Sequence, residues 1–385
     1  MNGEPYSAMR ETMRLMKSGD LLAATAAIQQ QLGAAPAAEP SPAAGSSGQD
    51  PIEGTFQVVD DNPPAKDTEA RGAPAADSVA EARTQFSEHT YSGLAGTRRY
   101  KLFIPTAYHG QPLPLVVMLH GCTQTPDDFA TGTRMNLLAE EHACFVVYPA
   151  QPQTANTSKC WNWFKVSDQR RDQGEPAIIA GLVRELLLTY GLDQDRVYVG
   201  GLSAGGAMAV ILGRTYPEVF AAVGVHSGLP YAAAHDLPSA LAAMKRGTNG
   251  SGDAPGKNAQ APVPTIVFHG DRDTTVHPGN GERVVGESTR ASFDASDSSS
   301  PAAATVESVT GGPPGVRPYT RRIFKDGEGK IIVEHWLVHG AGHAWSGGDP
   351  RGSYTDAKGP DASRAMLRFF VERVRPSHYR PDSLS

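Results

Sequence analysis

A serine between two glycines is the first feature of this sequence that could carry out chemistry. The stretch "VYVGGLSAGGAMAVIL", residues 197–212, contains the pattern Gly-x-Ser-x-Gly with its serine at Ser203. Where this pattern joins a strand to a helix, the serine lies on a sharp, strained turn that needs the small glycines around it. The start of the following helix directs free N–H groups at the turn. Ser203 is therefore a candidate nucleophile.

A serine hydroxyl is a weak nucleophile, and it needs a base and an acid to activate it. Asp273 and His343 follow Ser203 in the chain order that such sites use. We expect His343 to take the serine proton and Asp273 to hold the imidazole in the right tautomer. The backbone N–H groups of Ala204 and of Cys122, in the "HGC" stretch after an apolar run, are expected to bind the oxyanion.

Other polar residues near the same strand ends compete for these roles. Asp271 could be the acid, but we favour Asp273 because it lies further into its loop and precedes "TTV", which can return the chain to the core. His339 also precedes a glycine, but it belongs to the end of a strand, whereas His343 lies in a glycine-flanked loop. Three further histidines are expected to be structural: His120, His226 and His269.

The elements that must position these residues alternate between strand and helix over residues 88–375. Expected strands include "RRYKLFIP", "PLVVMLHG", "CFVVYP", "RVYVGG", "FAAVGVHSG" and "PTIVFHG", and "RRIFKDGEGKIIVEHWLVHG" predicts a hairpin whose second arm continues into the core. Apolar strands that alternate with helices predict the α/β class, with a mostly parallel sheet covered on both faces. Sites on such sheets lie beyond the carboxyl ends of the strands.

The rest of the chain has a different composition. Residues 1–33 have the periodicity of a helical hairpin, which we expect to dock on the main domain or fray rather than to bind a protein partner. Residues 34–87 are rich in Ala, Pro and Gly and predict a flexible linker. We expect surface loops over 246–261 and 294–318, and a flexible tail over 376–385.

The overall composition excludes several classes of function. A net charge of −6 argues against nucleic-acid binding, and no apolar run reaches the length that spans a bilayer. The first 32 residues lack the basic start and unbroken apolar run of a secretory signal, which predicts a cytoplasmic protein. The three cysteines have no metal-site spacing, and nothing in the sequence implies a metal or a cofactor.

Several motifs in order resemble the polyhydroxybutyrate depolymerase family of esterases, which also contains feruloyl and acetylxylan esterases. They are "VVMLHGCTQTPDDFATGTRMNLLAE", "VVYPAQ", "CWNWF", "GLSAGGAMA", "HGDRDTTVHPGNGERVV" and "HGAGHAWSGG". The resemblance covers residues 88–375 and implies an α/β-hydrolase fold and a serine esterase. It implies Ser203 as the nucleophile, Asp273 as the acid and His343 as the base, and an extracellular role for many members.

Aromatic residues near the site suggest a substrate cleft. Trp161 and Trp163 could line a cleft for an apolar acyl chain, although we expect at least one of them to cap the core instead. Trp345, two residues from His343, is the stronger candidate for a wall of that cleft.

The cysteines leave two alternatives open. A disulfide between Cys122 and Cys160 would fasten the "CWNWF" loop beside the oxyanion site and stabilise the fold by about 4 kcal/mol through loop entropy. The alternative is three buried thiols, which a reducing cytoplasm would favour. Cys144, within an expected strand, is expected to be a buried thiol in either case.

These features together predict a hydrolase of carboxylic esters that acts through an acyl-enzyme. The expected substrate is a hydroxyalkanoate polymer or oligomer, and the alternative is a feruloyl or acetyl ester on plant polysaccharide. A serine peptidase and a non-catalytic polymer-binding protein are less favoured, because the three polar residues and the "HGC" loop are all present.

Overall fold

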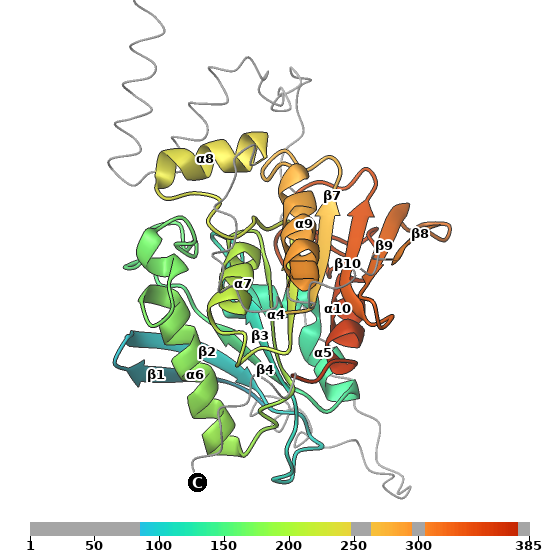
Figure 1. Ribbon diagram of the computed structural model, residues 1–385. Helices are drawn as coiled ribbons and strands as arrows, with labels where there is room; N and C mark the ends of the chain where they lie inside the picture. Colours follow the sequence, from blue (N-terminus) through green and yellow to red (C-terminus); the bar gives the residue numbers. More distant parts are fainter. Residues whose placement is uncertain (1–84, 248–262, 295–304, 376–385) are drawn as a thin grey trace, which may run out of the picture. The chain divides into compact units, whose positions relative to one another are not determined.

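A computed structural model describes residues 85–247, 263–294 and 305–375 of the chain (Figure 1). The expected helical hairpin over 1–33, nearly all of the expected linker over 34–87 and the tail over 376–385 therefore lie outside the described residues. The same is true of most of the expected loop over 246–261. Everything below concerns the described part of the chain.

A ten-stranded sheet forms the centre of the described domain, in the strand order β1-β2-β4-β3-β5-β6-β7-β10-β9-β8. Its strands are β1 (Phe86–Gly93), β2 (Gly96–Phe103), β3 (Leu115–Leu119), β4 (Phe145–Pro149), β5 (Val197–Leu202), β6 (Ala222–His226), β7 (Thr265–Gly270), β8 (Thr305–Gly311), β9 (Tyr319–Lys325) and β10 (Ile331–Val338). The six strands from β4 to β10 in the middle of this order run parallel, and antiparallel pairs extend both edges. The mostly parallel sheet that the sequence predicts is confirmed.

Helices cover both faces of this sheet (Figure 1). The helices are α4 (Pro126–Thr133), α5 (Met135–Glu141), α6 (Gly174–Tyr190), α7 (Ala204–Thr215), α8 (Leu237–Arg246), α9 (Gly279–Asp294) and α10 (Ala362–Val371). A 3-10 turn spans Val166–Gln169, and two short strands of two residues each, β11 (Trp345–Ser346) and β12 (Thr355–Asp356), pair with one another. Side chains alternate along each strand: Val117 and Val199 pack with α6, α7 and α9, while Val116 and Tyr198 pack with α4, α5 and α10. The buried residues therefore form two hydrophobic layers, one on each side of the sheet.

Two edge strands differ from what the sequence predicts. β1 (Phe86–Gly93) begins inside the segment expected to be linker, and it pairs along its full length with β2. β8 (Thr305–Gly311) lies inside the expected surface loop over 294–318 and pairs with β9. Both segments carry polar residues on one or both faces, as edge strands commonly do. A sequence with this composition is easily mistaken for a loop.

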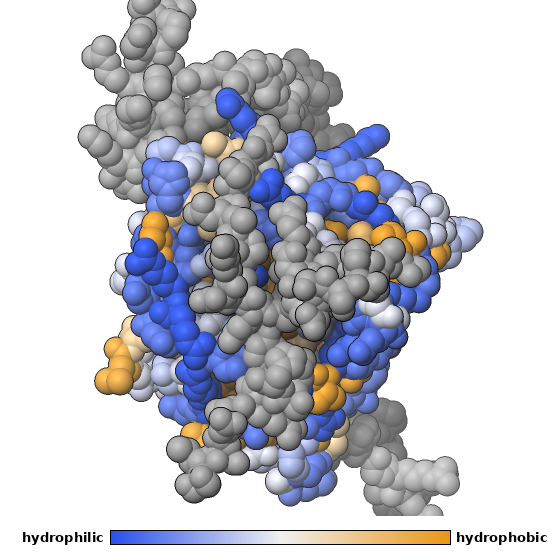
Figure 2. Space-filling model, in the orientation of Figure 1, coloured by the Kyte–Doolittle hydropathy of each residue, from blue (hydrophilic) through white to orange (hydrophobic). Residues whose placement is uncertain are grey.

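The apolar residues that remain exposed are spread over separate elements. Leu94 lies in the β1–β2 turn, Leu188 on α6 and Leu137 on α5, and each is more than half exposed. Figure 2 shows one face of the molecule as mainly hydrophilic, with apolar residues in small separate groups. Single exposed apolar residues are ordinary on protein surfaces and do not mark a binding site. The candidate site is therefore located from its polar side chains.

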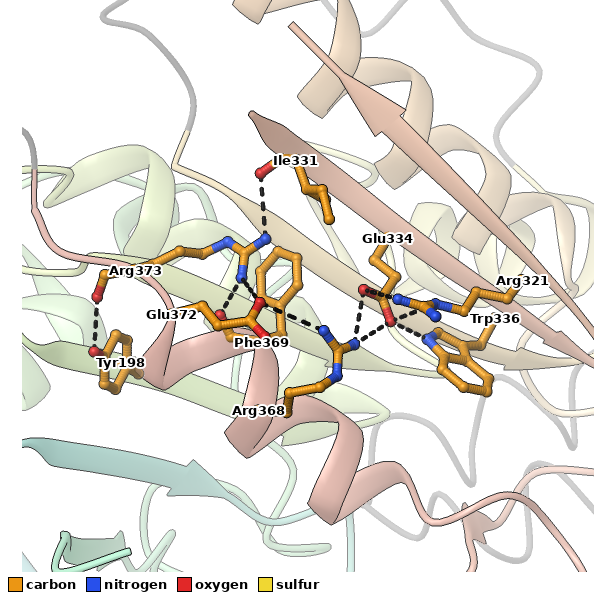
Figure 3. A network of polar contacts seen from close by, with 9 residues as sticks. All are labelled: Tyr198, Arg321, Ile331, Glu334, Trp336, Arg368, Phe369, Glu372 and Arg373. Carbon is orange, nitrogen blue, oxygen red and sulfur yellow. Dashed lines mark hydrogen bonds and ion pairs between the residues drawn. The ribbon is translucent and has the colours of Figure 1, made fainter. Parts of the chain in front are cut away.

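A buried carboxylate joins strands β9 and β10 to helix α10 (Figure 3). The side chain of Glu334, on β10, is fully buried and accepts hydrogen bonds from Arg321 (2.9 Å), Arg368 (2.6 Å) and the indole N–H of Trp336 (2.7 Å). Burial alone would raise the pKa of Glu334, but the hydrogen bonds from the two guanidinium groups outweigh it and lower the pKa. Strands β9 and β10 and the closing helix are therefore held by one ionised group.

Replacing Glu334 should destabilise the fold in a pH-dependent way. We expect Glu334→Gln to lower the free energy of unfolding by about 2–3 kcal/mol at neutral pH, because two charge-assisted hydrogen bonds are lost. Since the folded-state pKa of Glu334 is lowered, its stabilising effect is complete above the ordinary glutamate pKa and disappears as the pH falls through the lowered value. Urea denaturation at several pH values measures the difference between the two proteins.

Glu307→Gln provides the matched control. Glu307 pairs with Lys325 on the exposed surface of β8 and β9, so its loss should change the free energy of unfolding by less than about 1 kcal/mol. An equal effect of the two substitutions, or a Glu334 effect that persists at low pH, would contradict this account.

Candidate active site

Ser203 lies on the tight turn that joins β5 to α7. Its backbone has a φ of 58° and a ψ of −120°, a combination that residues other than glycine rarely adopt. Its N–H donates to the carbonyl of His226 (2.8 Å), and only 8% of the residue is exposed. A Cβ on Gly201 would lie 2.4 Å from the backbone of Gly205, and one on Gly205 would lie 2.1 Å from the carbonyl oxygen of Leu119. The two flanking glycines are therefore required by close backbone contacts.

Asp273 and His343 form a hydrogen-bonded pair beyond the ends of β7 and β10. His343 Nδ1 lies 2.7 Å from Asp273 Oδ2, while Asp273 Oδ1 accepts the backbone N–H groups of Thr275 (2.9 Å) and Val276 (2.8 Å). Burial alone would raise the pKa of Asp273, but the hydrogen bonds from His269 and His343 lower it strongly. The carboxylate is therefore ionised at neutral pH, and Nδ1 of His343 is the proton donor of the pair.

The competing acid, Asp271, and the competing base, His339, form a second, separate pair. Asp271 Oδ2 lies 2.9 Å from His339 Nδ1, and Asp271 Oδ1 accepts the N–H of Gly340 (2.7 Å). Both side chains are about one-third exposed, whereas Asp273 is fully buried and His343 is 11% exposed. The structure thus separates the Asp273 pair from the Asp271 pair, and of these two only Asp273–His343 is shielded from water.

The three histidines expected to be structural are fully buried and bonded to backbone. His120 Nδ1 donates to the Gly121 carbonyl (2.8 Å), His226 Nε2 accepts the Ser346 N–H (2.9 Å), and His269 Nε2 donates to the Val276 carbonyl (2.9 Å).

The pKa of His226 agrees with the structural role expected for this residue. Burial, followed by the charges of His269 and His343, lowers this pKa to about 3. The backbone carbonyl of His226 accepts the Ser203 N–H, so this strand end contacts the turn that carries Ser203.

The loop after β3 carries the expected oxyanion donor. The structure joins Cys122 to Cys160 by a disulfide, and Cys144 is a free, buried cysteine. Thr123, the next residue, has a φ of 67° and donates its N–H to the carbonyl of Ser158 (2.7 Å), in the loop that carries Cys160. On the other side, Ala204 is the first residue of α7, so its N–H has no partner within the helix.

The tryptophans expected to line a substrate cleft are buried in the core. Trp345 is 1% exposed, stacks on His226 and donates its indole N–H to Ser363 on α10 (3.0 Å). Trp161 is 0% exposed, and its indole N–H donates to the carbonyl of His120 (3.1 Å), while Trp163 is 5% exposed. All three side chains are packed against protein rather than facing a cleft, and the indole N–H groups of Trp161 and Trp345 both donate inside the fold.

Tyr354 and Gln124, which the sequence analysis did not single out, lie close to the same loop. Tyr354 is exposed, has a φ of 52°, and its hydroxyl lies 3.3 Å from Thr123 Oγ1. Gln124 accepts the Gly121 N–H (2.9 Å) and donates to the carbonyl of Ser353 (3.1 Å). Sequence gave no signal for either residue, since both act through contacts between segments far apart in the chain.

Two properties concern the described residues as a set. Within residues 85–247, 263–294 and 305–375, no group of three or more His, Cys, Asp or Glu side chains could hold a metal ion. The helices of these ranges include none that is long and apolar enough to cross a membrane.

Known proteins with related sequences are named as depolymerases or esterases. The chain is 36% identical over 239 residues to "Poly(3-hydroxyalkanoate) depolymerase C" of Paucimonas lemoignei, a match that covers 60% of this chain and 54% of that protein. It is 30% identical over 206 residues to "Probable acetylxylan esterase A" of Aspergillus fumigatus, covering 49% of this chain and 53% of that protein. The chain thus spans about half the length of these curated relatives.

A solved structure shares the fold. The acetyl xylan esterase from Aspergillus awamori aligns with a TM-score of 0.55 at 19% identity, covering 74% of this chain and 99% of that one. The expected α/β-hydrolase fold is thereby confirmed. The sequence profile described as "Esterase PHB depolymerase" matches residues 98–310, more than half of the chain, and the chain belongs to that family.

Proposed function

We propose that this protein is a serine esterase that hydrolyses carboxylic esters through an acyl-enzyme. The observation that carries the proposal is the buried hydrogen bond of 2.7 Å between His343 Nδ1 and Asp273 Oδ2, together with Ser203 on its strained turn. A buried carboxylate that fixes the imidazole tautomer leaves Nε2 free to accept a proton from a serine. The relatives named as depolymerase and esterases support the same reaction class.

The proposed reaction has two halves. In the first, His343 takes the Ser203 proton while Oγ attacks the ester carbonyl, and the resulting oxyanion accepts hydrogen bonds from the N–H groups of Cys122 and Ala204. His343 then returns the proton to the leaving alcohol, and the C–O bond to that alcohol breaks. In the second half, His343 activates a water molecule, which releases the acid and restores Ser203. Asp273 stays ionised throughout and stabilises the imidazolium.

For the substrate, we propose a hydroxyalkanoate polymer or oligomer. The support is the 36% identity to a protein named as a poly(3-hydroxyalkanoate) depolymerase, together with the family to which the chain belongs. Acetyl or feruloyl esters of plant polysaccharide are the alternative substrates, since other relatives are named as esterases of those classes.

Removing the nucleophile should abolish hydrolysis. We expect Ser203→Ala to lower kcat/KM on a short-chain p-nitrophenyl ester by about 10³- to 10⁶-fold, because only binding and the oxyanion donors would remain. A fluorophosphonate should label wild type at Ser203, which peptide mass spectrometry detects. Ser92→Ala, at an exposed serine of β1, is the control and should keep full activity. Activity that survives the loss of Ser203 would overturn the mechanism.

The two Asp–His pairs can be distinguished by matched substitutions. We expect Asp273→Asn to lower kcat by about 10⁴-fold, because an amide favours the wrong tautomer of His343. Asp271→Asn should lower kcat by less than about tenfold, because it changes only the pair with His339 and the contact with Gly340. Steady-state kinetics of both variants decides the assignment, which fails if the two effects are equal or reversed.

A substrate panel tests the proposed ester class. Hydroxybutyrate oligomers should show a higher kcat/KM than acetylated xylan, methyl ferulate or a set of peptides, measured by titration of released acid or by chromatography. A higher value for either plant ester would replace the proposed substrate with that class, and peptide cleavage alone would refute the esterase.

A further inference from the structure

A second cluster of buried polar residues lies beside the oxyanion loop and has no role in the reaction described so far. Its centre is Glu175, in the first turn of α6, and the residues around it are Arg98 on β2, Gln151 just after β4, and Asn162 in the loop after Cys160. Each of these four residues is less than 5% exposed. Gln151 and Asn162 belong to the "VVYPAQ" and "CWNWF" stretches, which the proposed reaction leaves unexplained.

Three N–H donors converge on the carboxylate of Glu175. Its Oε2 accepts the backbone N–H of Asn162 (2.8 Å), and its Oε1 accepts the side-chain amides of Asn162 (2.7 Å) and Gln151. An ionised carboxylate only accepts hydrogen bonds, so it satisfies all three donors at once. Burial and the nearby charge of Asp168 raise the pKa of Glu175, while the hydrogen bonds from Gln151 and Asn162 act against that rise.

Gln151 connects the Glu175 cluster to the two segments that are joined by the Cys122–Cys160 disulfide. Its backbone N–H donates to His120 Nε2 (3.1 Å), and its side-chain amide donates to the carbonyl of Cys160 (2.9 Å). His120 lies two residues before Cys122, and Cys160 is bonded to Cys122 through sulfur. Arg98 holds the side-chain oxygen of Gln151 at 2.5 Å, which fixes the orientation of the amide.

We propose that Glu175 is a positioning residue that holds the Cys122 N–H in the geometry of the oxyanion hole, through Gln151, His120 and the Cys122–Cys160 disulfide. This inference rests on the proposed esterase function. The loop needs such support, because Thr123, directly after Cys122, has a backbone conformation of high energy that persists only where the surroundings enforce it. An oxyanion donor acts only when it lies at hydrogen-bond distance from the charge that develops, so small displacements of the loop reduce the rate.

Glu175→Gln tests the inference without changing side-chain volume. The new amide NH₂ must face at least one of the three N–H donors, so Gln151 or the Asn162 backbone has to move. We expect kcat on a soluble ester to fall about 10²-fold while KM stays within twofold, since the oxyanion forms only in the transition state. Labelling of Ser203 by a fluorophosphonate should slow by a similar factor, and the pH midpoint of kcat should not move, because His343 and Asp273 are untouched.

Glu334→Gln is the matched control. It also replaces a buried glutamate whose donors are nitrogen groups, and it should lower stability without changing kcat by more than twofold. Thermal denaturation of each variant separates loss of stability from loss of rate.

A second variant covers the case in which Glu175→Gln does not fold. Gln151→Met removes the side-chain hydrogen bonds with Glu175, Cys160 and Arg98 and leaves the Glu175 side chain in place, and it should lower kcat by a similar factor. A wild-type kcat in a folded Glu175→Gln or Gln151→Met protein, or equal losses in these variants and in Glu334→Gln, would overturn the inference. If wild type has no esterase activity, or Ser203→Ala retains it, the proposed function fails instead.

Discussion

The close approach of three backbone segments at Ser203 is the constraint on which the site depends. Helix α7 begins so near the ends of β5 and β3 that a side chain at Gly205 would overlap the carbonyl of Leu119. This packing fixes Ser203 in its strained conformation, and the hydrogen bond to the His226 carbonyl completes the turn. It also brings the first N–H of α7 toward the loop that follows β3. One packing requirement therefore places the candidate nucleophile and Ala204, one of the two candidate oxyanion donors.

Sheet topology explains how the other two residues meet. Strands β7 and β10 are parallel neighbours, so the loops after them leave the sheet at the same edge. Asp273 lies in the first of these loops and His343 in the second. On its other side β10 pairs antiparallel with β9, as the second arm of the β9–β10 hairpin. The pairing of β7 with β10 thus brings together Asp273 and His343, which lie 70 positions apart in the sequence.

Sequence predicted the parts of the molecule whose signal is local. The apolar strands of the parallel core and the β9–β10 hairpin follow from residue types and spacing. The edge strands β1 and β8 were not predicted, because polar alternation in an edge strand resembles a loop. Trp345 was expected to face substrate because it lies near His343 in sequence. Its side chain instead packs inward, toward Ser363 on α10, which no pattern in the neighbouring residues indicates.

The Glu175 cluster shows a different limit of sequence-based reasoning. A glutamate in the first turn of a helix is ordinarily explained by the helix dipole and is expected to face solvent. Only the fold reveals that donors from two other segments converge on this one. A buried carboxylate costs more to desolvate than an apolar side chain of equal volume, so stability alone is a poor explanation for it. Directed hydrogen bonds fix the position of a group more closely than apolar contacts do. The hydrogen bonds of Glu175 reach Gln151, which in turn contacts His120 and Cys160 on either side of the Cys122–Cys160 disulfide.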